Sequence, residues 1–368
     1  MKTKCKIRLA ILVSLTLIIS LSVSVFLYSN SEAKTDSQYY KAVESGGEWF
    51  LNNQNENFLY YTYYPFIDEY DESQHSMREM GALWSIAKLN KFLDDERYEA
   101  LANKGFAYFE KYFEYSKDGD FIYVNITPTK IKLGYNAFAI LSLIELDHPN
   151  KEEFLDKLAE GILSLQQANG SLRTFFYSVR ATGKDYYPGE ALLSLMALYE
   201  YTGNQKYLEA VQKAFPYYVN YFEENPNTAF VPWQTRAYYK LFKATGDPEV
   251  RDFIFKMNDY MLREYKPKAK CSNYELNGIV TAVHAEAVNM AYDLARAKND
   301  KVRGTCYKNF SQEVADYILT LQLTEDNHFI KRGIGGFLGS PKSDSQRVDR
   351  NQHAVLTLMD MLEFGILQ

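Results

Sequence analysis

Three acidic residues stand at points of the chain where carboxyl groups could act together on one substrate. Glu190 follows Tyr186-Tyr187-Pro188-Gly189 and opens an apolar run, Glu286 opens a second apolar run, and Asp349 lies just before a third. Hydrolysis of a glycosidic bond generally needs one protonated carboxyl group as acid and one ionised group as base or nucleophile. We therefore predict Glu190, Glu286 and Asp349 as catalytic residues.

The same carboxylates also suit a purely structural role. Acidic side chains in the first turn of a helix accept hydrogen bonds from free backbone N–H groups and are stabilised by the helix dipole. Capping and catalysis therefore both remain open for Glu190 and Glu286.

Aromatic, basic, imidazole and amide side chains occur near the same points. Aromatic rings can stack on sugar faces while their polar atoms form hydrogen bonds. Arginines can hold an anionic group such as a uronate carboxylate through paired hydrogen bonds. We therefore predict substrate-binding roles for Tyr186, Tyr187, Trp233, His284, His353, Arg78, His75, Asn136 and Arg347.

Spacings typical of metal sites are absent from the sequence. No His-Glu-x-x-His or Cys-x-x-Cys motif occurs, so we predict neither a metal ion nor another cofactor. A zinc site formed by Cys271, His284 and Cys306 is the alternative. The two cysteines could also form a disulfide or remain buried thiols.

The elements that would carry these residues repeat along the chain. Residues 190–200 (Glu-Ala-Leu-Leu-Ser-Leu-Met-Ala-Leu-Tyr-Glu) align without a gap with residues 353–363 (His-Ala-Val-Leu-Thr-Leu-Met-Asp-Met-Leu-Glu). The same register adds four further apolar segments, which makes six. The six segments begin at Gly81, Asn136, Glu190, Trp233, Glu286 and His353.

Each segment has helical periodicity, and several are followed by a turn and a second, more amphipathic helix. Thr202-Gly203-Asn204 and Thr245-Gly246-Asp247-Pro248 supply two of the turns. Six such hairpins can close into a ring with the apolar helices inside. We predict an all-α fold, an (α/α)6 toroid of six helical hairpins that forms one domain over residues 34–368. An open solenoid is the alternative.

In a closed toroid the inner helices run in the same direction, so their first residues meet at one end of the ring. The polar residues at these starts would then surround a shared funnel. This arrangement is the reason to expect that Glu190, Glu286, Asp349 and His353 act on one ligand.

The six-hairpin count and two local motifs resemble a known superfamily. The motifs are Ser164-Leu165-Gln166-Gln167-Ala168-Asn169-Gly170-Ser171, which precedes an inner helix, and the Tyr-Pro-Gly-Glu start at residue 187. They resemble the six-hairpin glycosidase superfamily and its toroidal relatives, which include uronyl hydrolases and sugar epimerases. The resemblance covers nearly all of residues 34–368, assigns no role to an individual residue, and implies a carbohydrate ligand bound in the funnel.

The expected function is that of an exported glycoside hydrolase-like enzyme acting on a polysaccharide or oligosaccharide. Three alternatives remain open. They are a non-catalytic toroid for glycan binding or envelope assembly, a sugar epimerase or lyase, and a cyclase-like toroid.

The net charge indicates which partners to expect, and the N-terminal sequence indicates where the protein is located. The net charge is −6 and no Lys/Arg stripe could neutralise phosphates, so we predict no nucleic-acid partner. A basic stretch over residues 2–8 precedes an apolar run over residues 9–27, and residues 1–33 are therefore predicted to be a signal peptide or an N-terminal membrane anchor. We expect an extracytoplasmic protein, either secreted or attached to the membrane by this segment.

Overall fold

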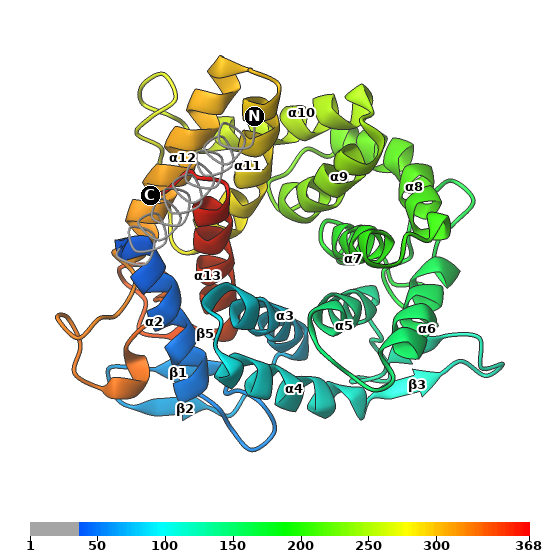
Figure 1. The fold of residues 1–368 in the computed structure, drawn as a ribbon, viewed down its shortest axis with the longest axis horizontal. Coiled ribbons are helices and arrows are strands. Elements are labelled where there is room, and N and C mark those ends of the chain that lie inside the picture. The colour runs from blue at the N-terminus through cyan, green and yellow to red at the C-terminus, as the bar shows by residue number, and fades with distance from the viewer. Residues whose placement is uncertain (1–36) are drawn as a thin grey trace, which may run out of the picture.

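Six helices form the inner wall of a ring in the computed structural model, which describes residues 37–368. The predicted signal segment, residues 1–33, lies outside the described residues. Each inner helix packs against the next, and the last packs against the first, which closes the ring (Figure 1). The inner helices are α3 (Ser76–Leu93), α5 (Leu133–Glu145), α7 (Tyr187–Thr202), α9 (Val231–Thr245), α11 (Val280–Ala297) and α13 (Val348–Glu363).

Six outer helices surround this wall, as Figure 1 shows. Five of them follow their inner partner in the chain. The partner of α13 is the first described helix, so the first and last helices of the described residues together form the sixth hairpin. The Ser37 hydroxyl donates to the Gln368 carbonyl at 2.8 Å beside this closure. The outer helices are α2 (Gln38–Asn52), α4 (Glu96–Glu110), α6 (Lys151–Ser164), α8 (Gln205–Glu224), α10 (Pro248–Glu264) and α12 (Lys301–Leu319).

The predicted all-α (α/α)6 toroid is thereby confirmed, and its hairpin turns have the expected chemistry. Helices α7 and α9 end at Gly203 and Gly246, whose φ angles of 71° and 69° lie in the left-handed region that favours glycine. The side chains of Asn204 and Asp247 then cap the first turns of α8 and α10.

Short strands, which the helical pattern did not predict, border the ring. Strands β1 (Thr62–Tyr64), β2 (Glu69–Asp71) and β5 (Gln346–Arg347) form an antiparallel sheet in the order β2-β1-β5. Strands β3 (Phe113–Tyr115) and β4 (Ile122–Val124) form a second pair. Because β5 leads directly into α13, its pairing with β1 fixes the position of Arg347 next to the start of that helix.

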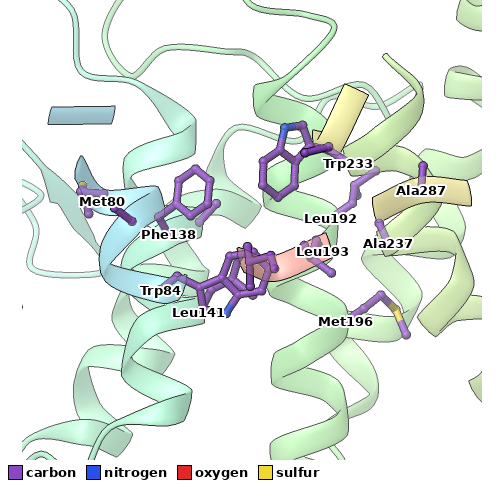
Figure 2. Close-up of a cluster of buried hydrophobic side chains, with 14 of the residues drawn as sticks. Met80, Trp84, Phe138, Leu141, Leu192, Leu193, Met196, Trp233, Ala237 and Ala287 are labelled. Atoms are coloured by element: carbon purple, nitrogen blue, oxygen red, sulfur yellow. The ribbon is translucent and has the colours of Figure 1, made fainter. Parts of the chain in front are cut away.

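The centre of the ring is filled by side chains from the inner helices (Figure 2). Trp84 of α3, Phe138 of α5 and Trp233 of α9 lie in mutual contact, with ring centroids 5.5 to 6.3 Å apart. All three are buried, as are Leu192 and Met196 of α7. This packing closes the middle of the ring and leaves room only towards its ends.

Cys271, in the segment before α11, is joined to Cys306 of α12 in a disulfide. The sequence left a disulfide, two buried thiols and a zinc site as possibilities, and the structure has the disulfide. Neither sulfur is then a free thiol that could bind zinc. Among residues 37–368, no helix combines the length and the apolar composition needed to cross a membrane.

Candidate active site

A cavity of about 680 Å³ lies at the end of the ring where the inner helices begin. Its walls come from the first turns of α3, α7, α9, α11 and α13, with Phe138 of α5 contributing from deeper in the ring. The cavity brings together ten of the residues singled out in the sequence. They are Glu190, Asp349, Tyr186, Tyr187, Trp233, His284, His353, Arg78, His75 and Arg347.

Glu190 is a buried carboxyl group with little to stabilise its charge. Its side chain is 5% exposed, and its Oε2 atom has no hydrogen-bond partner. Burial raises the pKa of Glu190 to about 8, although the charge of Lys132 opposes part of that rise. Glu190 therefore carries a proton at neutral pH and can act as a hydrogen-bond donor or general acid.

Asp349 has the opposite environment on the other side of the same cavity. Arg347 donates two hydrogen bonds to its carboxylate, at 3.0 and 2.7 Å, and Arg78 lies 3.2 Å away. Burial alone would raise the pKa of Asp349, but the Arg347 hydrogen bonds and the two positive charges outweigh burial and lower it. Asp349 is thus an ionised group held firmly by arginines.

The arginines around Asp349 outnumber the carboxylates. Arg350 also lines the cavity, and its guanidinium binds Ser345 and Ser343. Within residues 37–368 no carboxylate lies within ion-pair distance of Arg350, and burial lowers its pKa. With Arg78 and Arg347, this makes three cations and one anion at the rim, which leaves a net positive charge for a ligand.

Glu286 does not line the cavity, which corrects the prediction that it faces a substrate. It is 1% exposed, and its Oε1 atom lies 2.7 Å from the Nδ1 atom of His353. Its Oε2 atom accepts a hydrogen bond from Arg236 at 2.8 Å. The Glu286 carboxylate therefore contacts the imidazole but does not line the cavity, whereas His353 does.

Arg236 and Asp360 complete this buried chain and were not recognised in the sequence. Arg236 donates to Asp360 at 2.9 Å as well as to Glu286. Burial alone would lower the pKa of Arg236, but the Asp360 and Glu286 charges outweigh it and raise that pKa. One signal in the sequence could have revealed them. Arg236 and Asp360 are charged residues at inner positions of two predicted inner helices, and a fully buried charge needs a partner.

His284 forms a second imidazole in the cavity wall. Its Nδ1 atom lies 2.5 Å from the hydroxyl of Tyr265, and burial, assisted by the nearby His353, lowers its pKa to about 4. His284 is therefore neutral at physiological pH. Among the described residues, no group of histidine, cysteine and acidic side chains is arranged to hold a metal ion.

Asn136 lies away from the cavity, contrary to prediction. Its amide nitrogen donates to the carbonyls of Ile122 and Leu158, and its oxygen accepts from the N–H of Val124. It thus joins α5 to β4 and α6. These three hydrogen bonds hold the Asn136 side chain away from the cavity, although Asn136 is the fourth residue of its helix, as Glu190 is of α7.

The aromatic residues differ in how far they are available to a ligand. Tyr186 is 46% exposed and Tyr187 is half-buried, so both offer ring surface at the cavity edge. Trp233 is only 5% exposed and lies 6.1 Å from the His353 ring, which places it in the floor of the cavity. His75 contacts the Tyr61 ring at the start of α3, and its Nδ1 atom has no partner in the described chain.

No protein-family model and no curated protein matches the sequence. Several solved structures share the fold. A D-mannose isomerase aligns with a TM-score of 0.66 and 12% identity over 90% of this chain and 98% of that one. A family 76 α-1,6-mannanase from Salegentibacter aligns with a TM-score of 0.64 and 13% identity over 89% of this chain and 100% of that one. A cellobiose 2-epimerase from Bacillus thermoamylovorans gives a TM-score of 0.60 and 12% identity, over 86% and 95% of the two chains.

These similarities extend over nearly the whole ring and agree with the superfamily resemblance that the sequence indicated. At 12 to 13% identity they establish the toroid fold and no more.

Proposed function

We propose that the protein is a carbohydrate-active enzyme that removes a proton from a sugar carbon beside a carbonyl or carboxylate group. It then delivers a proton that has exchanged with solvent to the other face of that carbon or to the neighbouring carbon. Sugar epimerases and isomerases carry out this kind of chemistry. The observation that carries the proposal is the 2.7 Å contact between His353 Nδ1 and the buried Glu286, with the imidazole ring lining the cavity.

His353 has the arrangement of a general base. The Glu286 carboxylate accepts a hydrogen bond from Nδ1–H and holds the ring in one orientation, so that Nε2 carries the free electron pair. Arg236 supplies the counter-charge that keeps Glu286 in this role. Nε2 of His353 is then the atom that would take the proton from the sugar.

Glu190 and the arginine cluster would supply the remaining needs of the reaction. Proton removal beside a carbonyl or carboxylate places negative charge on an oxygen atom, which needs a proton donor or fixed positive charge. Glu190 is protonated below about pH 8, and Arg78, Arg347 and Arg350 exceed Asp349 in charge. Two of the structural neighbours are an isomerase and an epimerase of sugars, which supports the same class of substrate.

Hydrolysis of a glycosidic bond is the second candidate, and one observation favours it. Glu190 and Asp349 share a cavity and their pKa values are shifted in opposite directions, as expected for an acid and its ionised partner. Two observations weigh against it. Asp349 is neutralised by Arg347 and Arg78, and the chain has no counterpart in the cavity for the two consecutive aspartates whose replacement gives inactive Salegentibacter mannanase. The one such pair in the sequence, Asp94-Asp95, follows the opposite end of α3.

Product analysis separates the two candidates. The protein is incubated with D-mannose, cellobiose, α-1,6-mannotriose and oligogalacturonate, and the products are identified by NMR and mass spectrometry. We expect a product of unchanged mass from at least one sugar, and we expect His353→Asn to abolish it. His148→Asn, which changes a histidine in the turn beyond α5, should leave it intact.

New reducing ends instead of an isomer would support hydrolysis. Sugar binding without any conversion would support the non-catalytic glycan-binding toroid. In either case the proposal for His353 would be wrong.

Export is a separate proposal that rests on residues 1–33. The basic and apolar composition of this segment is typical of a signal peptide or membrane anchor, and an extracytoplasmic location suits an enzyme that meets glycans. Fractionation of cells that make the full chain or a chain lacking residues 2–33 tests it. Equal amounts of both chains outside the cytoplasm would contradict it.

A further inference from the structure

A second recess of about 200 Å³ lies beside the start of α7, between the segment that joins α6 to α7 and the outer helix α8. Pro188 of α7 lines this recess, while Tyr186 and Tyr187 line the main cavity. The two depressions therefore flank the same helical turn. Figure 1 shows α6, α7 and α8 on one side of the ring.

All the charged residues that line the recess are cations. Arg173, Arg180 and Lys184 contribute to its wall, and no acidic side chain does. In the described chain no ion pair joins these three cations to a carboxylate. The protein as a whole carries a net charge of −6, so a site with three cations and no acid departs from the general surface.

The nearest acid in sequence, Asp185, is hydrogen-bonded but is not itself a lining residue of the recess. The Asp185 carboxylate accepts hydrogen bonds from the Tyr221 hydroxyl at 2.8 Å and from the Asn227 amide at 3.2 Å. Asp185 does not line the recess, although Tyr221 does, and it forms no ion pair with Lys184 in the described chain. The positive charge of the recess remains available to a ligand.

The other lining groups suit a sugar. Tyr217 and Tyr221 of α8 provide ring surface, and Ser171, Ser178 and Thr174 provide hydroxyl groups. Guanidinium groups bind carboxylate or sulfate oxygens through paired hydrogen bonds. A site that combines cations, tyrosines and hydroxyls fits a sugar unit that carries a negative charge.

We propose that this recess binds an acidic sugar unit of an oligosaccharide whose reacting unit lies in the main cavity. The inference rests on the proposed function for the nature of the ligand. The excess of arginines around Asp349 points to the same charge on the reacting unit. The substrate would therefore be a chain with repeated negative charges, either carboxylates or sulfates.

Binding is measured by isothermal titration calorimetry in the His353→Asn background, so that turnover does not interfere. The probes are oligogalacturonate, a sulfated galactan oligosaccharide and neutral α-1,6-mannotriose. The recess variant combines Arg173→Gln, Arg180→Gln and Lys184→Gln. The matched control combines Lys243→Gln, Lys270→Gln and Lys301→Gln, which removes the same charge at exposed positions away from the recess.

We expect the recess variant to bind an acidic oligosaccharide roughly tenfold more weakly than the control variant, since each exposed ion pair contributes modestly. The loss should shrink at high salt, and neutral mannotriose should not distinguish the two variants. Preference for one of the two acidic probes would identify the anion.

Equal affinity of the recess and control variants for both acidic probes would overturn the inference. The result is independent of proton transfer. If the recess binds acidic chains but no sugar is isomerised, only the proposed function fails; if isomerisation occurs with no effect of the recess, only this inference fails.

Discussion

At the scale of single residues, Glu190 and His353 have complementary environments within one cavity. Glu190 is buried without an ion pair in the described chain, and burial outweighs the charge of Lys132, so it keeps its proton. His353 has a carboxylate hydrogen-bonded to its ring. An acid and a base on the same ligand are the minimum for moving a proton from one position to another.

The pH dependence of activity should report on Glu190. If its protonated form is required, activity should fall as pH rises through about 8, the pKa of this carboxyl group. Glu190→Gln should lower kcat by roughly 10²- to 10⁴-fold and remove that alkaline limb. A pH–rate profile from about pH 5 to about pH 10 provides the measurement.

The same shift affects stability. The pKa of Glu190 is higher in the folded chain than its ordinary value of 4.5, so the folded state binds the extra proton, and the stabilisation present at low pH is lost as pH rises through about 8. The free energy of unfolding of wild type should therefore fall relative to Glu190→Gln between about pH 5 and about pH 9 in urea titrations. Parallel stability curves would show that Glu190 is not protonated in the folded protein.

At the scale of helices, the shape of the site depends on close contacts between first turns. Gly134 at the start of α5 leaves the space that the Glu190 carboxyl group and Met77 occupy, and a Cβ atom at this position would overlap both. The absence of a side chain on α5 thus positions an acid on α7.

We expect Gly134→Ala to displace Glu190 and to reduce activity at least tenfold, while the protein still folds. Gly304→Ala is the matched control, because a Cβ atom there would meet nothing within 4 Å and alanine favours the interior of α12 by roughly 0.5–1 kcal/mol. Enzyme assays and thermal unfolding of both variants test this. Full activity in Gly134→Ala would contradict the assigned position of Glu190.

The charged chain inside the ring links three inner helices, α9, α11 and α13. Arg236→Met removes the central cation, so that Glu286 loses its ion pair and Asp360 keeps only Lys88, 3.9 Å away. This loss should cost about 3–5 kcal/mol of unfolding free energy. Arg296→Met breaks an ion pair with Asp293 in which the arginine is largely exposed. Asp293 keeps its hydrogen bond from Tyr239, so the change should cost at most about 1 kcal/mol. Similar losses measured by urea unfolding in the two variants would contradict the role of this chain.

At the scale of the whole molecule, the sequence predicted the ring because the repeat is a property of every hairpin. One sequence is enough to show these repeated features. They are the apolar period, the Gly-Asn and Gly-Asp turns, and the gapless match of residues 190–200 with 353–363. They sufficed to place ten of twelve site candidates around one cavity.

Asn136 and Glu286 are the two candidates that do not line the cavity. Asn136 and Glu286 were assigned by register alone, and the register does not show which side of each helix meets the cavity. The roles of Arg236 and Asp360 depend on contacts between residues 124 positions apart in the sequence. No local pattern encodes such a contact.

The disulfide acts on the same large scale, since it closes a loop across the fifth hairpin. Cys271 and Cys306 are 35 residues apart, and their removal in a Cys271→Ser, Cys306→Ser double variant should lower the unfolding free energy by about 2–4 kcal/mol. Thermal unfolding of the variant, beside wild type with and without reductant, tests this. An unchanged Tm in all three samples would contradict a stabilising disulfide.

We propose above all that His353 removes a proton from a sugar carbon. It is tested most directly by following the reaction in D2O by NMR, with wild type and His353→Asn. We expect wild type to incorporate solvent deuterium at the carbon beside the carbonyl or carboxylate group as the isomer forms, and His353→Asn to incorporate none. Conversion of the sugar without deuterium at that carbon, or incorporation that persists unchanged in His353→Asn, would contradict it.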